Sequence, residues 1–321
     1  MGNMHSAYTM SFPPKTLFTV DQIPDLTGQV IILCSGNTGI GKETCKALLN
    51  KNAKVYLAAR SKPKAEEAIE WLKGETNGKA ATFLELDLAN LASIRKGAEE
   101  FKSKEDELHV LFNNAGVMAP PVEQRTTDGY DLQFGTNVLG HYFLTALLLP
   151  ILIHTAKNSP VAYGHTRVVN TSSMGAFWAP KEGIVWEALG TDATSVQACK
   201  KLGTGQLYLH SKLGNVLFSN ELAKRYGEQR IISSSVHPGI IQSDLPRHLG
   251  KLAAKIYNYF LYPSSQGALT QLWAGTMPEG LSQSGKYLIP WARVGNMPPS
   301  AQDDKLAEKL WAWLEEQVKG H

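Results

Sequence analysis

The sequence has few cysteines, little net charge and no long apolar run, and each of these features excludes a class of protein. Only Cys34, Cys45 and Cys199 are cysteine among 321 residues, too few for a disulfide framework, which indicates a reducing compartment. The 32 basic and 29 acidic side chains leave a formal charge of +3, and no lysine or arginine block favours a nucleic-acid partner. The longest apolar run, 142–153, contains Pro150 and is too short to span a bilayer.

The first 27 residues form an arm without hydrophobic periodicity. Prolines at positions 13, 14 and 24 interrupt it, so we expect irregular structure up to the first strand. No apolar segment of signal-peptide length precedes a small-residue cleavage site, which favours a cytoplasmic protein over a secreted one. Residues 1–6, Met-Gly-Asn-Met-His-Ser, match the pattern for N-myristoylation, and the alternative is an ordinary unmodified start.

Short apolar runs alternate with helical patterns from residue 30 onward. The strand-like runs cover residues 30–34, 55–59, 81–86, 109–113, 167–171 and 231–236. The helical patterns cover residues 40–51, 63–73, 91–102, an apolar stretch within 129–156, and 207–226. Later residues add helical patterns at 245–262, 265–275 and 301–318 and a strand at 286–289. Apolar runs between helices are typical of parallel strands buried on both faces, so we expect one α/β domain over residues 28–321, a three-layer doubly wound parallel sheet of the Rossmann type.

A glycine-rich turn separates the first strand from the first helix. In this context backbone N–H groups and a helix N-terminus can approach a pyrophosphate, whereas the same residues outside it would indicate only a tight turn. The candidate cofactor contacts here are Ser35, Asn37, Thr38, Gly39, Ile40 and Gly41.

The residues after the second strand indicate which dinucleotide is bound. An acid at this point usually holds the ribose 2′-hydroxyl of NAD, but the strand is followed instead by Arg60 and Lys62. Both cations can pair with a 2′-phosphate, so the sequence favours NADP(H) over NAD(H). The alternative is a solvated basic loop.

Two further strand ends carry candidate cofactor contacts. Asp87, followed by Leu88, comes after the third strand, where its carboxylate can accept a hydrogen bond from an adenine amino group. The alternative for Asp87 is an N-cap of the next helix, for which the spacing is poor. Asn114, Ala115 and Gly116 follow the fourth strand, where small residues let the chain pass close to a bound ring, although alone they could form a turn.

A tyrosine and a lysine four residues apart supply candidate chemistry. Tyr208 and Lys212 share one helix face, so the phenol and the ammonium can be neighbours. A nearby cation lowers the pKa of a tyrosine from about 10 and suits it to proton transfer near neutral pH. Alone, this spacing is frequent by chance.

Taken in order, these motifs resemble those of the short-chain dehydrogenase/reductase family over residues 28–290. The resemblance includes Asn137 and the pair Ser172-Ser173 between the fourth-strand motif and Tyr208. It implies hydride exchange between a nicotinamide cofactor and a carbonyl or alcohol. Within the family, segments 167–173, 210–215 and 235–239 are most similar to the retinol-dehydrogenase-like reductases.

The resemblance also implies a role for each matched residue. Tyr208 would exchange a proton with the substrate oxygen, Ser173 would hydrogen-bond that oxygen, and Lys212 would lower the Tyr208 pKa and bind the nicotinamide ribose. Asn137 would hold a water that links Lys212 to solvent. Residues implied to contact the nicotinamide part are Pro238, Gly239, Ile241 and Ser243. No metal ligand is implied, and Ser172 is expected to be a structural strand-end residue.

The glycine-rich turn departs from the family pattern. Cys34 and Ser35 stand where the family usually has a threonine and a first glycine. A side chain there narrows the approach to the pyrophosphate, unless Ser35 has a negative φ and is simply tolerated. We expect Gly36 to supply the flexibility one position later.

Two segments are expected to cover the substrate. Residues near 174–206 and 244–264 are rich in aromatic and aliphatic side chains and would flank the active site as substrate lids. Such a lining suits a lipophilic or aromatic small-molecule substrate. The alternative is that these side chains pack a lid or the core.

Three other readings of the same residues stay open. The altered turn allows a non-catalytic NADP-binding sensor or interaction protein, against which the intact tyrosine, lysine, serine and asparagine set argues. An isomerase or dehydratase could use the same tyrosine and lysine. The outer faces of the helices within 129–156 and 207–226 would pair in a homodimer, unless their leucines are mostly core.

Overall fold

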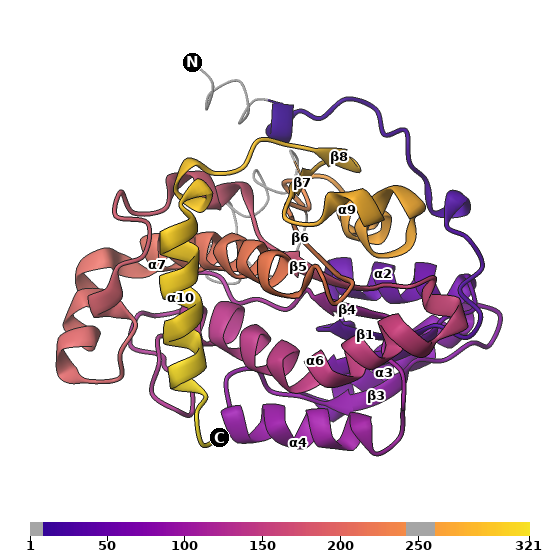
Figure 1. Ribbon diagram of the computed structural model, residues 1–321, viewed down its shortest axis with the longest axis horizontal. Coiled ribbons are helices and arrows are strands. Elements are labelled where there is room, and N and C mark those ends of the chain that lie inside the picture. Colours follow the sequence, from indigo (N-terminus) through magenta and orange to yellow (C-terminus); the bar gives the residue numbers. More distant parts are fainter. Residues whose placement is uncertain (1–8, 242–260) are drawn as a thin grey trace.

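An eight-stranded sheet in the order β3-β2-β1-β4-β5-β6-β7-β8 forms the centre of the molecule, in a computed structural model that describes residues 9–241 and 261–321 (Figure 1). The strands are β1 Val30–Cys34, β2 Lys54–Ala59, β3 Thr82–Glu85, β4 Val110–Asn113, β5 Thr166–Thr171, β6 Ile231–Val236, β7 Tyr287–Ile289 and β8 Arg293–Val294. Neighbouring strands are parallel except for the antiparallel pair β7 and β8. The expected doubly wound α/β fold is confirmed.

Helices cover both faces of the sheet, which explains why a strand such as β1 is apolar and buried along its whole length. The longer helices are α2 Gly39–Asn50, α3 Lys62–Glu75, α4 Leu91–Lys102, α6 His141–Asn158, α7 Ala193–Tyr226, α9 Ser264–Thr276 and α10 Asp304–Gln317. Successive residues of β1 show the two layers: Ile31 and Leu33 pack with α2, α3 and α9, whereas Ile32 and Cys34 pack with α4, α6, α7 and α10. Figure 1 shows α9 and α2 on one side of the strands and α4 and α6 on the other.

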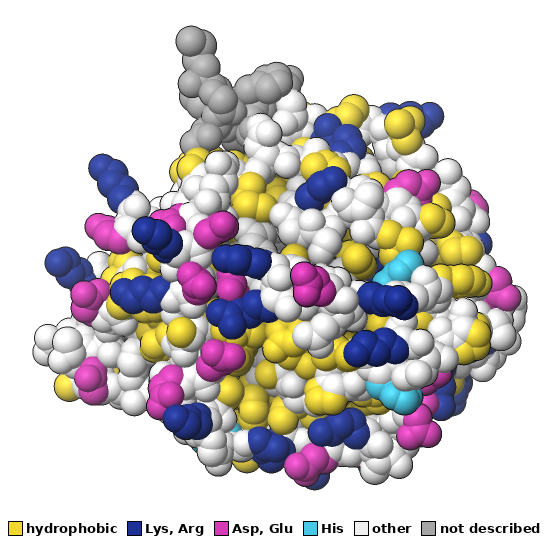
Figure 2. Space-filling view, in the orientation of Figure 1, with side chains coloured by type: hydrophobic (Ala, Val, Ile, Leu, Met, Phe, Trp, Pro, Cys, Tyr) yellow, Lys and Arg dark blue, Asp and Glu magenta, His cyan; other side chains and the backbone are white. Residues whose placement is uncertain are grey.

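The apolar helical region Leu132–Asn158 is long and hydrophobic enough to cross a membrane, but 72% of its most apolar window is buried inside the protein. Leu144 and Leu148 of α6 are fully buried, so these leucines are core residues. Leu147 and Ile153 are half-buried. On the face drawn in Figure 2, apolar side chains appear among interspersed basic and acidic ones. A homodimer through this face stays a prediction.

The structure differs from the expected elements in the second half of the chain. Helix α7 begins at Ala193, inside the expected lid segment, and Gly203 breaks it with a non-helical φ of 74° and ψ of 158°. Because glycine alone tolerates this conformation at little cost, one helical run becomes two consecutive pieces. Strand β8 was not expected, and the helix expected at 245–262 lies almost wholly outside the described residues.

Candidate functional site

Many of the residues singled out from the sequence gather along one edge of the sheet, because they follow the carboxyl ends of parallel strands. The glycine-rich turn follows β1, Arg60 follows β2, Asp87 follows β3, and Gly116 follows β4. Ser173 follows β5 on the same edge. In open α/β sheets this edge is where ligands bind.

The glycine-rich turn corrects two expectations about its backbone. Ser35 has a φ of 61°, in the left-handed region, so it is not tolerated through a negative φ. Its N–H donates to the main-chain oxygen of Ala58 at 2.7 Å, which holds this unusual conformation in place. Gly36 is required for packing instead, since a Cβ there would lie 2.8 Å from Cys45 Sγ and 2.9 Å from Leu57 Cγ.

The N-terminus of α2 is open towards the cofactor edge. Thr38 is its N-cap residue, but the Thr38 side chain makes no capping hydrogen bond to the first turn. Asn114 Nδ2 donates to the main-chain oxygen of Cys34 at 3.0 Å and ties the end of β4 to the turn. A Cβ at Gly41 would collide with the Ser35 carbonyl group. The first-turn N–H groups therefore fit an anionic pyrophosphate.

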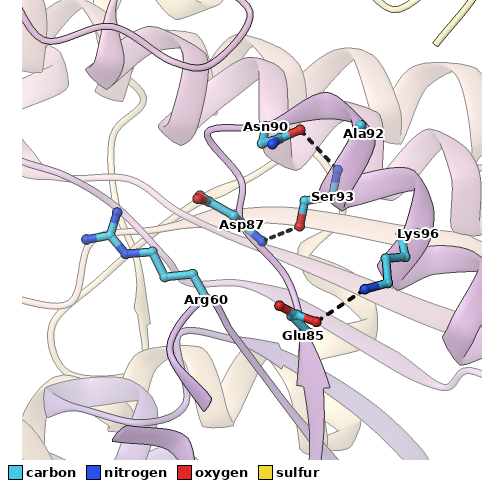
Figure 3. Close-up of a pocket in the computed structure, with 7 residues that line it drawn as sticks. All are labelled: Arg60, Glu85, Asp87, Asn90, Ala92, Ser93 and Lys96. Carbon is cyan, nitrogen blue, oxygen red and sulfur yellow. Dashed lines mark hydrogen bonds and ion pairs between the residues drawn. The ribbon is translucent and has the colours of Figure 1, made fainter. Parts of the chain in front are cut away.

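A cavity of about 470 Å³ lies beside this turn, at the ends of β2 and β3 (Figure 3). Its lining residues are Arg60, Glu85, Asp87, Asn90, Ala92, Ser93 and Lys96. The N-cap of α4 is Asn90, which accepts from Ser93 N at 3.1 Å, so Asp87 does not have the capping role. Asp87 Oδ1 accepts from Ala89 N at 3.0 Å. In Figure 3 its carboxylate lies between Arg60 and the start of α4, and its expected contact to an adenine amino group stays a prediction.

The two basic residues after β2 have different positions. Arg60 lines the cavity, whereas Lys62 begins α3 and pairs with Glu66 at 3.9 Å. Lys62 is not among the residues that line the cavity. Sequence reasoning missed the wall formed by α4, although a helix that starts four residues after Asp87 must present its first turn to the same edge.

The amine of Lys212 is buried at the carboxyl end of β5. Lys212 is 4% exposed, and its Nζ donates to the main-chain oxygen of Thr171 at 3.0 Å. Burial lowers the pKa of Lys212 to about 8. Its Nζ lies 5.8 Å from the centre of the Tyr208 ring, so the expected neighbourhood of amine and phenol is present.

Ser173 and Tyr208 both lie close to Gly175. Ser173 caps the 3₁₀ helix Met174–Trp178, and its Oγ accepts from Gly175 N at 3.1 Å. A Cβ at Gly175 would lie 3.4 Å from Ser173 Oγ and 3.8 Å from Tyr208 Cε1. Ser172 instead donates to the main-chain oxygen of Lys212 at 2.7 Å. It therefore joins β5 to α7, in the structural role expected for it.

Asn137 lies in a π-helix, Gly135–Gly140, and orders the loop after β4. Its Oδ1 accepts from Val117 N at 2.8 Å, and its Nδ2 donates to Ser211 Oγ at 2.9 Å. A Cβ at Gly116 would lie 3.4 Å from Asn137 Oδ1 and 3.5 Å from Lys212 Nζ. Gly116 thus lies directly against both side chains. The water expected at Asn137 stays a prediction.

Residues after β6 form the far end of the site. Gly239 has a φ of 98°, and a Cβ there would lie 2.9 Å from Trp291 Cη2. Ile241 is buried and forms a parallel bridge with Tyr262. Pro238 is half-buried beside them, and Ser243 lies outside the described residues. Trp291 was missed because it follows β7, and its packing on Gly239 leaves no local pattern in the sequence.

These features together fit a nicotinamide dinucleotide. The uncapped helix N-terminus suits the pyrophosphate, the cavity at Asp87 suits the adenosine, and Gly116 lies beside Lys212, which is expected to bind the nicotinamide ribose. Ala115 and Leu88, the remaining candidate contacts, pack at the ends of β4 and β3. Within residues 9–241 and 261–321, no group of three or more His, Cys, Asp or Glu side chains is placed to hold a metal ion.

Known proteins match this chain over its whole length. A family model described as short chain dehydrogenase matches residues 29–188. A short-chain dehydrogenase/reductase of Armillaria gallica is 53% identical over 100% of both chains. Retinol dehydrogenase 12 of Homo sapiens is 38% identical over 89% of this chain and 85% of its own. A solved structure from Mycobacterium paratuberculosis, 27% identical, has a TM-score of 0.70 and covers 95% of this chain and 98% of that one.

Proposed function

Because this chain belongs to the short-chain dehydrogenase/reductase family and is an oxidoreductase of that family, we propose that it uses NADP(H) to interconvert a lipophilic or aromatic carbonyl compound and its alcohol. The observation that carries the proposal is the cluster of Ser173, Tyr208 and Lys212 at the edge that also carries Arg60. The cluster supports proton transfer to an oxygen, and Arg60 supports the choice of cofactor.

In this proposal Tyr208, Ser173 and Lys212 have different roles in the reaction. When bound, the nicotinamide group supplies the hydride that forms the new C–H bond in reduction and accepts it in oxidation. Tyr208 donates its phenolic proton to the substrate oxygen as the C=O double bond becomes C–O–H. Ser173 donates a hydrogen bond to the same oxygen, and the charge of Lys212 stabilises the phenolate that Tyr208 becomes. Protonation from solvent then restores Tyr208.

The charges around the cavity support NADP(H). Arg60 lines the cavity that we assign to the adenosine, and no carboxylate follows β2 to accept hydrogen bonds from a 2′-hydroxyl. A guanidinium recognises phosphate through two parallel hydrogen bonds. Lys96 also lines this cavity, but it already pairs with Glu85 at 3.4 Å.

The substrate class is inferred from the segment that follows Ser173. Phe177 packs edge-on against Tyr287, and Trp178 leaves 48% of its surface exposed. Both belong to the 3₁₀ helix that Ser173 caps, so aromatic surface lies within a few residues of the reacting group. Such surface suits an apolar or aromatic substrate.

The test is NADPH oxidation against a panel of aromatic and long-chain ketones. We expect Tyr208→Phe to lower kcat by about 10²- to 10⁴-fold, the usual contribution of a general acid. We expect Arg60→Gln to raise the KM for NADPH by about 10- to 100-fold, the value of a charge-assisted contact, and to leave the KM for NADH unchanged. Lys62→Gln is the matched control and should change either KM much less.

Two outcomes would overturn the proposal. If Tyr208→Phe keeps the wild-type rate, the proton does not come from this phenol. If the protein binds NADPH but turns over no carbonyl or alcohol in the panel, it is a binding protein on this fold rather than a reductase.

A further inference from the structure

A second cavity, of about 380 Å³, lies between the N-terminal arm and the β7–β8 ribbon. Its lining residues are Thr9, Met10, Ile289, Arg293, Val294, Gly295 and Asn296. In Figure 1 the start of the described chain lies beside β8, far in sequence from the strands that it contacts. None of these residues has a place in the chemistry described above.

The geometry of the β7–β8 ribbon relates this cavity to the segment that follows Ser173. Tyr287 and Ile289 are two residues apart on β7, so their side chains share one face. Arg293 is directly opposite Ile289 in the antiparallel pair and therefore projects to the same face. Tyr287 packs on Phe177, with ring centres 5.9 Å apart, in the segment that follows Ser173. Tyr287 and Ile289 are both buried on this face, which joins the segment that follows Ser173 to the wall of the cavity.

The N-terminal arm forms one wall of the cavity through Thr9 and Met10. Met10 is 2% exposed, and the main-chain oxygen of Thr9 accepts from Arg293 Nη2 at 3.2 Å. Ser11 Oγ lies 3.6 Å from the sulfur of Met174, the residue directly after Ser173. The arm therefore contacts the ribbon and the catalytic segment together, and it shapes the space between them.

Arg293 brings a positive charge into this space without a matching negative one. Its Nε donates to Pro290 O at 2.8 Å, and its Nη2 donates to Pro290 O and Thr9 O. Within residues 9–241 and 261–321, Nη1 has no hydrogen-bond acceptor and no carboxylate forms an ion pair with Arg293. Burial lowers the pKa of Arg293, whose side chain is half-buried at the cavity. An anion in the cavity would form a charge-assisted pair with this guanidinium.

We propose that this cavity is the outer end of the substrate site, where Arg293 binds a carboxylate at the end of the substrate farthest from the reacting carbon. This inference rests on the proposed function and narrows it. The substrate class is an elongated apolar ketone or alcohol with a terminal carboxylate: the apolar part extends from the segment that follows Ser173 towards the cavity, and the acid reaches the guanidinium.

The first experiment uses a matched pair of medium-chain ketones, one ending in a carboxylate and the other in its methyl ester, with NADPH as the reductant. We expect the wild type to have the lower KM for the acid. Arg293→Gln should raise the KM for the acid by about tenfold or more and leave the ester unchanged, since one charge-assisted contact is lost. Arg293→Lys should retain part of the preference. Lys286→Gln, an exposed cation just before β7, is the matched control.

A second variant tests the cavity rather than the charge. A Cβ at Gly295 would collide with Ile289 Cγ2 and would lie 3.1 Å from Ile289 Cδ1. Gly295→Ala should therefore push Ile289 into the cavity and raise the KM for both long ketones, but not for a short aromatic ketone. Equal effects on the long and the short substrates would contradict this position of the cavity.

A binding readout separates this inference from the proposed function. Decanoate should raise the melting temperature of the wild type more than decanol does, and Arg293→Gln should abolish the difference. If the wild type reduces the acid and the ester with equal KM and decanoate gives no Arg293-dependent shift, the subsite is wrong while the reductase function stands. If no ketone is reduced, the proposed function fails, and the decanoate shift alone decides the subsite.

Discussion

Replacing Lys212 with methionine should remove a defined dependence of stability on pH. The Lys212 amine is buried, and its pKa falls from the ordinary 10.5 to about 8 in the folded protein. Between these two values the unfolded chain holds a proton that the folded chain has lost. The free energy of unfolding therefore rises with pH across this window, and the penalty for burying the charge is fully present below pH 8.

The size of the effect follows from the shift. Each pH unit between the two pKa values adds about 1.4 kcal/mol, so raising the pH from 8 to 9.5 should stabilise the wild type by about 2 kcal/mol relative to Lys212→Met. The hydrogen bond to Thr171 O is lost in the variant at every pH. The loss of this hydrogen bond therefore shifts the difference in unfolding free energy by a constant amount and does not change its slope with pH.

Denaturant unfolding of both proteins between pH 6 and 9.5 is the assay, with the difference in unfolding free energy plotted against pH. Lys200→Met, an exposed lysine earlier on α7, controls for the loss of one lysine. The unfolding free energy of Lys212→Met minus that of the wild type should be constant below about pH 7 and should fall steadily above pH 8. A flat curve throughout would mean that the Lys212 amine is not desolvated, and the electrostatic reasoning about Tyr208 would fail with it.

Three other substitutions test the packing of the site. Ser172→Ala should lower the free energy of unfolding by about 1 kcal/mol, measured in denaturant, because Lys212 O loses a buried donor; an unchanged midpoint would contradict that role. Gly41→Ala should weaken NADPH binding, measured by titration, about tenfold or more, because the new Cβ meets the Ser35 carbonyl, whereas Gly74→Ala, with open space around it, should not. Tyr287→Phe should keep or raise the melting temperature, because the Tyr287 hydroxyl is buried without a partner in the described part of the chain, and a clear loss would reveal a partner.

The fold and most of the candidate site could be predicted because both depend on local patterns. Buried runs such as Val30–Cys34 indicate parallel strands, and parallel strands bring their carboxyl ends to one edge. Asp87, Gly116 and Ser173 are far apart in sequence, yet each follows such a run. Tyr208 and Lys212 needed only the helical repeat to be neighbours.

The parts that could not be predicted depend on contacts between distant residues or on backbone conformation. The hydrogen bond from Arg293 to Thr9 joins residues 284 apart, and no periodicity in either segment signals it. The left-handed conformation of Ser35 is held by the neighbouring strand rather than by its own preference. Gly203 is a glycine within a helical pattern, and sequence alone does not distinguish a tolerated glycine from a break.

The π-helix at Gly135–Gly140 makes the position of Asn137 sensitive to the number of residues in this segment. A π-helix closes its hydrogen bonds one residue later than an α-helix, so it behaves as a one-residue insertion. Here the main-chain oxygen of Asn137 is bound by the side chains of His141, at 2.9 Å, and Asn215, at 2.5 Å. Deleting a single residue from this segment would let the helix become regular and keep the buried face of α6, yet it would rotate Asn137 away from Lys212. A homologue shorter by one residue here should keep the fold and lose the hydrogen bonds that join Asn137 to Val117 and Ser211.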